Sequence, residues 1–339
     1  MMKSFLKHGL PGRAGKTFRV AASLALCAVV AACGSGSADI SASTGSSTGA
    51  SLKSGYQQAK WSTAGNMTVT FTGDCTMTIT TNDLPNHKMA TYYLEPVNST
   101  YPMMIASNFA GPLSVQPNTR TAANQTYTVN ICPTKATAPS ATNLGTIGIM
   151  ISGADLFNAF EGDGKTPALT DNASAVAPDG TTAKFLDECN GHYAPRPGQS
   201  GSNGQYHYHA LPRCITDQVD TSGGPSHLIG IAADGFPIYG GRDINGKVIS
   251  VSQLDACNGI TSPTPEFPNG VYHYVLPEGV TDKQSSLNCY AGTVGSAMAL
   301  AIAQSTSICS VARTPPVLAR STVQPIRKTK APDMTPRAS

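Results

Sequence analysis

The sequence predicts a mainly β protein: an antiparallel β-rich domain with an internal tandem duplication into two similar lobes, disulfide staples and a short C-terminal helix. Three observations lead to this prediction. Apolar residues alternate with threonine in two regions, one set of landmarks occurs twice in the same order, and the chain has 9 cysteines. The chain also has 33 glycines, 24 prolines and 13% charged residues, against about 25% in typical proteins. This composition excludes a coiled coil and a helical repeat array.

The charge distribution argues against a nucleic-acid partner. The formal net charge of +3 arises at the two ends, because residues 1–32 and 311–339 are both basic. Residues 33–310 carry 12 Lys and Arg against 19 Asp and Glu, a net charge of −7. A mildly acidic body is repelled by a phosphate backbone and is compatible with cations.

Residues 1–32 are predicted to be a signal peptide. A basic stretch precedes an apolar run of 13 residues, 20–32, which is too short for a bilayer span of about 20 residues but typical of a secretory signal. The run ends in Val30-Ala31-Ala32-Cys33, which resembles the lipobox of bacterial lipoproteins. An ordinary signal peptide followed by a chance cysteine is the alternative.

The lipobox resemblance implies that Cys33 carries lipid, including palmitate, and becomes the first residue of a membrane-anchored mature chain. Residues 33–58 are rich in Gly, Ser and Thr and are predicted to be a flexible linker. Gly34 implies sorting to the outer membrane if the cell is Gram-negative. We therefore expect a lipid-anchored protein of the bacterial cell envelope, facing the periplasm, where disulfides can form.

The folded domain is expected over residues 59–310, and its first part, 59–145, is expected to be strands. Apolar residues alternate with threonines in residues 66–81, and residues 125–131 repeat the pattern. A period of two is typical of half-buried antiparallel strands.

From residue 146 onward the sequence repeats itself. The recurring landmarks are Ile147-Gly148-Ile149 with Ile229-Gly230-Ile231, Gly164-Lys165 with Gly246-Lys247, Leu186-Asp187 and Cys189-Asn190-Gly191 with Leu254-Asp255 and Cys257-Asn258-Gly259, and Tyr206-His207-Tyr208 with Tyr272-His273-Tyr274. We assign repeat one to residues 146–214 and repeat two to residues 228–290. Two similar lobes related by a pseudo-dyad are the expected result, because two copies are too few for a solenoid.

These landmarks resemble one family, the bacterial and eukaryotic proteins named for their YHYH motif. The segments that carry the resemblance are Tyr206-His207-Tyr208-His209, Leu186 to His192, Asp234 to Gly240, and Asn82 to His87, where Asp83 stands in place of the family's glycine. The resemblance covers roughly residues 65–310 and implies no particular activity. In the second copy Val275 stands where the family often has a second histidine.

A histidine cluster is the main functional signal. Five of the 7 histidines fall between residues 192 and 273. Side chains alternate faces along a strand, so His207 and His209 share one face and can chelate one cation, with His192 as the third ligand. Imidazole suits copper and zinc, the two metals we expect. His87 and His273 are weaker candidates.

The alternative for these histidines is a structural role. His207 and His273 occur in both copies and are equally well explained as buried, hydrogen-bonded core residues. His192 and His209 align with Ile260 and Val275, so the fold accepts apolar groups at these two positions. Their polarity therefore favours a function in the first lobe.

Three aspartates are possible second-shell partners of the histidines: Asp187, Asp255 and Asp234. Asp187 and Asp255 each precede an Asn-Gly pair, which favours a turn role, and Asp234-Gly235 is a hairpin signature. His227 has no counterpart in the first copy and is interpreted as a solvated loop residue.

Seven cysteines remain after Cys27 leaves with the signal peptide and Cys33 takes lipid. We expect the pairs Cys75–Cys132, Cys189–Cys214 and Cys257–Cys289, with Cys309 left over. Cys289–Cys309 is the competing pair for the last of these.

Three classes of function remain open. The first is a metal-handling envelope lipoprotein, the second is a hydrolase or oxygenase with the same metal site, and the third is a metal-free module that binds a glycan, protein or small molecule. No nucleophile elbow, phosphate loop or His-Glu-x-x-His motif is present, so no catalytic residue is assigned. Residues 294–304 predict a short helix, and the Pro-rich basic tail 311–339 predicts disorder.

Overall fold

The computed structural model describes residues 49–94, 113–115, 125–194, 205–296 and 298. These residues belong to one unit that spans residues 47–339. The predicted signal peptide, Cys33, Cys309, the tail 311–339 and most of the helix expected at 294–304 lie outside the described residues. None of the described helices is long and apolar enough to span a bilayer.

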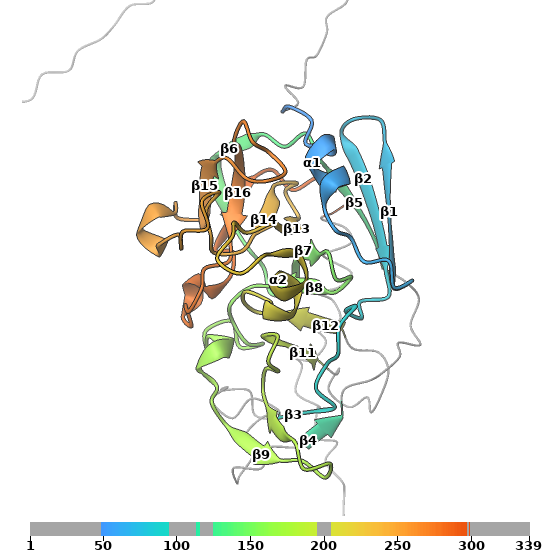
Figure 1. Ribbon diagram of the computed structural model, residues 1–339, viewed down its shortest axis with the longest axis vertical. Helices are drawn as coiled ribbons and strands as arrows, with labels where there is room; N and C mark the ends of the chain where they lie inside the picture. The colour runs from blue at the N-terminus through green and yellow to red at the C-terminus, as the bar shows by residue number, and fades with distance from the viewer. Residues whose placement is uncertain (1–48, 95–112, 116–124, 195–204, 297, 299–339) are drawn as a thin grey trace, which may run out of the picture. The chain divides into compact units, whose positions relative to one another are not determined.

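The first strands form the sheet that the alternating pattern predicts. Strands β1 (Met67–Thr72), β2 (Thr76–Thr81) and β5 (Gln125–Asn130) pair antiparallel in the order β1-β2-β5 (Figure 1). The apolar side chains of β2 and β5 are buried, whereas the threonines between them are half-buried or exposed. The sheet therefore has one core face, as a period of two requires.

The predicted linker is shorter than residues 33–58. Residues 49–58 pack against the domain and include helix α1 (Lys53–Gln58). The amide of Leu52 donates to the carbonyl of Ile131 at 2.9 Å, and the buried Tyr56 donates through its hydroxyl to the carbonyl of Gly235 at 2.9 Å. Composition suggested a linker here, but the apolar ring of Tyr56 gains enough burial to hold the segment in place.

The central sheet has eight strands in the order β11-β12-β8-β7-β13-β14-β16-β15. Their bounds are β7 Thr146–Met150, β8 Asp155–Phe157, β11 Gly191–Ala194, β12 Gln205–Tyr208, β13 Leu228–Ala232, β14 Pro237–Tyr239, β15 Gly259–Ser262 and β16 Val271–Val275. The middle pair, β7 and β13, is antiparallel. On either side of it the same order follows: an antiparallel pair, a parallel pair and another antiparallel pair.

The two halves of this sheet thus have the same topology. The fold is mainly β with mostly antiparallel pairs, as the sequence predicted, and the parallel pairs β8–β12 and β14–β16 make the central sheet mixed. Two similar lobes are visible in the strand order, and the duplication that produced them stays a prediction.

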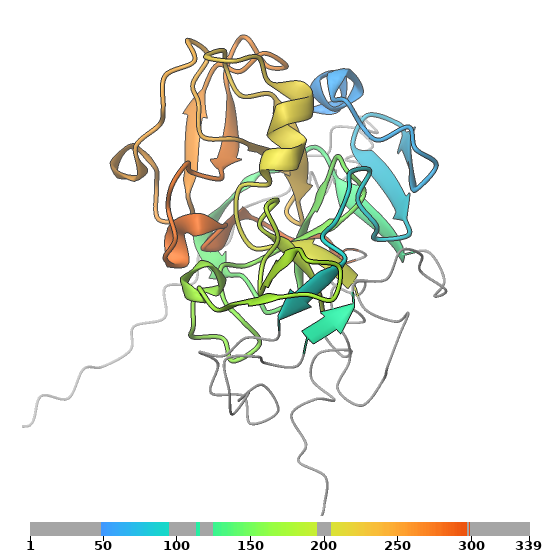
Figure 2. The ribbon, with the colours of Figure 1, turned by 60° about the horizontal axis from the view of Figure 1, so that its bottom comes forward.

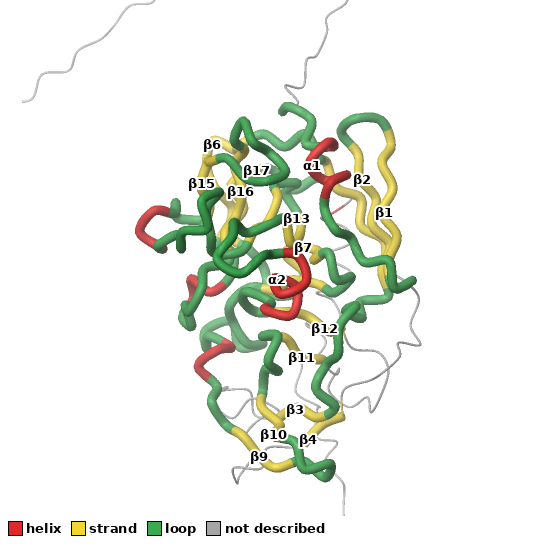
Figure 3. The backbone as a smooth tube through the Cα atoms, viewed as in Figure 1, coloured by secondary structure: helices red, strands yellow, loops and turns green. Residues whose placement is uncertain are grey.

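The remaining elements are short and are joined by long loops (Figure 3). Two-stranded sheets pair β3 (Tyr92–Leu94) with β4 (Leu113–Val115), β6 (Lys135–Ala141) with β17 (Cys289–Gly292), and β9 (Ser174–Val176) with β10 (Thr182–Lys184). Helix α2 (Arg213–Val219), the yellow helix of Figure 2, packs beside β13. Single 3-10 turns occur at Ala168–Thr170, Val251–Gln253 and Lys283–Ser285.

One turn is built identically in both lobes, and it confirms the turn role of Asp187 and Asp255. The Oδ1 atom of Asp187 accepts from the amides of Cys189 and Gly191 at 2.9 and 3.2 Å, and its Oδ2 accepts from the Tyr206 hydroxyl at 2.7 Å. Asn190 has a φ of 60°, in the left-handed region that asparagine tolerates. A Cβ at Gly191 would overlap the Tyr206 hydroxyl, so only glycine fits there.

The second lobe repeats this turn around Asp255. Its partners are the amides of Cys257 and Gly259, the hydroxyl of Tyr272, and Asn258 with a φ of 64°. All three expected disulfides are formed, namely Cys75–Cys132, Cys189–Cys214 and Cys257–Cys289.

Candidate metal centre

The structure brings together the three histidines of the first lobe. His192 lies on β11 and is the direct antiparallel partner of His207 on β12, so their side chains meet on one face of the sheet. His209 follows two residues after His207, immediately beyond the strand, and therefore shares that face. All three residues are buried, with 6%, 2% and 3% of their surface exposed.

The Nε2 atoms of these histidines converge on one point. The Nε2 atom of His209 lies 3.1 Å from that of His207 and 3.3 Å from that of His192. Zinc–nitrogen bonds of about 2.0–2.1 Å at tetrahedral angles place ligand nitrogens roughly 3.3–3.4 Å apart. The two spacings at His209 are therefore close to those of imidazoles around one metal ion, and the ligand atoms of all three residues lie within 4.8 Å of one another.

Hydrogen bonds fix the tautomers of two of the three rings. The Nδ1–H of His207 donates to the backbone carbonyl of Gln205 at 3.0 Å, and the Nδ1–H of His209 donates to the carbonyl of Asn158 at 2.7 Å. A carbonyl oxygen can only accept, so the ring proton sits on Nδ1 and a lone pair sits on Nε2. Carbonyl partners of this kind orient metal-bound histidines in many proteins.

The triad is neutral near pH 7. Burial lowers the pKa of His209 to about 4. Burial, and then the neighbouring imidazoles, lower the pKa values of His192 and His207 well below the ordinary value. Neutral imidazole is the form that binds a metal. Near pH 7 none of the three rings carries the second proton that would block its metal-binding nitrogen.

Aromatic rings form the walls of the site. Phe157 stacks on His207 with ring centroids 3.7 Å apart, and Phe185 meets His192 edge-on at 4.3 Å. The ring of Tyr93 lies 5.9 Å from that of His192. Such walls exclude water and strengthen electrostatic interactions inside the site. None of these aromatic residues was predicted to line the site. Phe157 aligns with Tyr239 of the second repeat, and this recurring aromatic position is the sequence signal that could have identified it.

A buried carboxylate, that of Asp155, contacts the strand that carries His207. Asp155, on β8, accepts a hydrogen bond from the side chain of Gln205 at 2.6 Å. The same oxygen of Asp155 accepts from Thr146 at 2.8 Å and from Tyr127 at 3.1 Å. The backbone carbonyl of Gln205 accepts the hydrogen bond from His207 Nδ1–H. Asp155, by holding the Gln205 side chain, therefore helps to fix the position of that carbonyl. The sequence analysis did not identify this residue.

The three predicted second-shell aspartates lie elsewhere. Asp187 and Asp255 hold the turns described above, and no hydrogen bond joins them to the described histidines of the triad. Asp234 accepts from the Tyr274 hydroxyl and, at 2.8 Å, from the amide of Gly292. The partners that orient His207 and His209 are instead backbone carbonyls.

His273 occupies the corresponding place in the second lobe and lies apart from the triad. Its Nδ1–H donates to the carbonyl of Val271 at 3.0 Å, as His207 does to Gln205. Its cross-strand partner is Ile260 where His207 faces His192, and Val275 stands in place of His209. The second lobe therefore has one imidazole at this place, and His273 belongs to no group of three potential metal ligands among the described residues.

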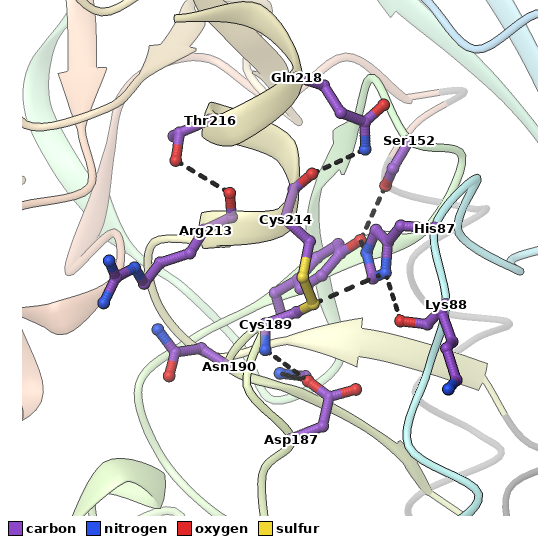
Figure 4. The surroundings of a disulfide bond; sticks show 12 residues. His87, Lys88, Ser152, Asp187, Cys189, Asn190, Arg213, Cys214, Thr216 and Gln218 are labelled. Carbon is purple, nitrogen blue, oxygen red and sulfur yellow. Dashed lines mark hydrogen bonds between the residues drawn. A yellow bond between two sulfur atoms is a disulfide. The ribbon is translucent and has the colours of Figure 1, made fainter. Parts of the chain in front are cut away.

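His87 also lies outside the triad. Its Nε2 is 2.6 Å from the Tyr208 hydroxyl, which in turn lies 2.9 Å from Ser152 Oγ. Its Nδ1 is 3.0 Å from the carbonyl of Lys88 and 3.6 Å from Cys189 Sγ (Figure 4). His87 thus contacts β12 through the rings of Tyr206 and Tyr208, which alternate with the histidines along the strand.

The interpretation of His227 as a solvated loop residue was wrong. Its Nδ1 lies 2.8 Å from Glu266 Oε1, and the other oxygen of Glu266 accepts from the Tyr239 hydroxyl at 2.8 Å. Glu266 is distant in the sequence and only the fold brings it to this loop. The buried carboxylate holds His227, which is only partly exposed.

The comparison with protein families gives one match. Residues 126–246 and 241–292 match the model of the YHYH protein family. This match supports a relationship of residues 126–292 to the YHYH family. The matched YHYH region includes both lobes and all three histidines of the triad. No curated protein and no solved structure matches the chain, so its function has to be argued from the site.

Proposed function

We propose that this YHYH protein binds one copper or zinc ion through the Nε2 atoms of His192, His207 and His209, and handles that metal at the bacterial cell envelope. The observation that carries the proposal is the convergence of three neutral, buried imidazole nitrogens at 3.1 and 3.3 Å. Imidazole nitrogen is a preferred ligand of both metals.

A metal-free hydrogen-bonded cluster explains the same geometry less well. His207 and His209 carry their protons on Nδ1, so only His192 can supply a proton between the Nε2 atoms. That proton can form a hydrogen bond with His209 Nε2 at 3.3 Å. The lone pairs of His207 Nε2 and His209 Nε2 then face each other at 3.1 Å in a buried site. The Nδ1 atom of His192 has no hydrogen-bond partner among the described residues. A cation removes the remaining repulsion.

The envelope part of the proposal rests on the N-terminal sequence. The basic start, the short apolar run and Cys33 support export and lipid anchoring, with Gly34 favouring the outer membrane. Three disulfides in the described chain are typical of an exported protein. The net charge of −7 over residues 33–310 suits a protein that meets cations.

A metal-dependent enzyme is the second candidate. Three ligands among the described residues leave a coordination position for water or substrate, as catalytic zinc sites do. We place metal handling first because all three ligands are buried behind aromatic rings, which restricts the approach of a substrate.

Elemental analysis of the mature chain, exported so that its disulfides form, tests the proposal. We expect about one equivalent of copper or zinc per chain, and its loss in the His192→Ala/His209→Ala variant. His273→Gln is the matched control in the second lobe and should keep the metal. If none of these proteins holds metal after reconstitution, the triad is structural and a metal-free binding module becomes the better explanation.

A further inference from the structure

One disulfide differs from the other two in its surroundings. The Nδ1 atom of His87 lies 3.6 Å from the sulfur of Cys189, in the Cys189–Cys214 bond (Figure 4). Among the described residues, no histidine nitrogen contacts a sulfur of either of the other two disulfides. A histidine beside a sulfur is the arrangement that stabilises a thiolate.

The hydrogen bonds of His87 direct a donor at this sulfur. Its Nδ1 lies 3.0 Å from the carbonyl of Lys88, which only accepts, so the ring proton sits on Nδ1. Its Nε2 accepts from the Tyr208 hydroxyl at 2.6 Å, and Tyr208 accepts from Ser152. The Nδ1–H is therefore shared between the Lys88 carbonyl and Cys189 Sγ.

The two sulfurs differ in accessibility. Cys189 is buried, with 3% of its surface exposed, whereas Cys214 is half-buried at the start of α2. An incoming thiolate therefore reaches Cys214 first, and Cys189 becomes the leaving group. The leaving sulfur is the one that His87 contacts.

We propose that Cys189–Cys214 is a thiol–disulfide exchange site for dithiol reductants, in which His87 donates a hydrogen bond to the Cys189 thiolate as it leaves. One thiolate of the dithiol attacks Cys214 Sγ, the S–S bond breaks, and its electron pair stays on Cys189 Sγ. The second thiolate of the dithiol then attacks the reductant sulfur that is bonded to Cys214 Sγ. The mixed disulfide breaks, and Cys214 is released as a thiolate. The chain gains two electrons and two protons, and the dithiol becomes a cyclic or internal disulfide.

Exchange at this site acts on the metal centre, a consequence that rests on the function proposed above. The loop closed by Cys189–Cys214 spans a separation of 25 residues and contains His192, His207 and His209. Opening it frees the turn that precedes β11 from the start of α2, and a less constrained ligand loop has more conformational entropy to lose on binding. Reduction therefore lowers the metal affinity of the triad.

The first experiment follows each disulfide of the metal-free mature chain during reduction by dithiothreitol, with alkylation and mass spectrometry at timed points. We expect Cys189–Cys214 to open about tenfold faster than Cys257–Cys289, its counterpart in the other lobe. His87→Ala should remove that advantage while Cys257–Cys289, in the same molecule, keeps its rate. Equal opening rates in the wild-type chain would overturn the proposal, and this comparison does not depend on the folding of any variant.

The second experiment measures zinc and copper affinity of the Cys189→Ser/Cys214→Ser variant, with Cys257→Ser/Cys289→Ser as control. We expect a loss of at least about tenfold in the first variant only. An unchanged affinity would refute the coupling to the metal centre. If the wild-type chain binds no metal at all, the proposed function fails, while the exchange experiment still decides the present proposal.

Discussion

The two lobes have the same strand order, and they differ in the residues that face one another across the outer strand pair. In the first lobe His207 faces His192, and in the second His273 faces Ile260. Both His207 and His273 donate through Nδ1 to a carbonyl two residues earlier in the chain. The shared histidine therefore belongs to the architecture.

The positions that differ carry the candidate function. His192 and His209 stand where the second lobe has Ile260 and Val275, which are apolar. The second lobe keeps the same strand order and the same pairing of its outer strands without these two imidazoles, so the topology does not require them. Two side chains therefore distinguish the lobe with the candidate metal site from a lobe of the same strand order without it.

Copying the second lobe into the first should have the largest effect. We expect His209→Val to weaken zinc or copper binding more than a hundredfold, because one of three ligands is lost and even outer contacts of metal ligands are worth 10- to 100-fold. The metal-free chain should stay folded, with its free energy of unfolding lowered by no more than about 2 kcal/mol, because the variant removes a buried lone-pair contact together with the hydrogen bond to the Asn158 carbonyl. Titration calorimetry and chemical denaturation measure the two quantities. An unfolded variant, or unchanged affinity, would contradict the comparison.

The stability of the metal-free chain should depend on pH through the first lobe. Burial lowers the pKa of His209 from 6.5 to about 4, so between these values the unfolded state binds more protons than the folded state. Stability present above pH 6.5 is therefore lost as the pH falls toward 4, by on the order of 3 kcal/mol for this residue. Urea denaturation at a series of pH values measures it. His209→Val should flatten this slope, and an unaltered slope would show that other groups control acid unfolding.

The shared histidines should matter about equally. We expect His207→Ala and His273→Ala each to lower the free energy of unfolding of the metal-free chain by about 2 kcal/mol, since each breaks one buried hydrogen bond and leaves a cavity. Denaturant unfolding of the two variants side by side is the measurement. A large asymmetry between them would mean that the two lobes do not use this residue in the same way.

Local sequence patterns were sufficient to predict the candidate metal-binding histidines and the turns. His207 and His209 are two residues apart, and the alternation of side chains along a strand is enough to place them on one face. The two backbone amides that Asp187 accepts from belong to residues within four positions of it in the chain. The loop between Cys189 and Cys214 is short enough for spacing to suggest their pairing.

Contacts between distant segments could not be predicted in this way. The carbonyl of Asn158 that orients His209, the ring of Phe185 against His192, and the side chain of Asp155 behind Gln205 come from other strands and loops. No residue pattern near the histidines points to these partners, since each is chosen by how the strands pack.

The same division explains the two corrected interpretations. Residues 49–58 look like a linker by composition, yet α1 docks because Tyr56 finds a buried partner 179 residues away. His227 looks like a loop residue, yet it meets Glu266 across 39 residues. Sequence alone was enough for the alternating strands of the first sheet, the turns and the choice of the three histidines, because these depend on short-range periodicity and backbone geometry. For the last disulfide it left Cys257–Cys289 and Cys289–Cys309 open, and the fold shows the first of these pairs. The convergence of the three nitrogens, their tautomers, their burial and the histidine beside one disulfide depend on long-range packing, and only the folded chain reveals them.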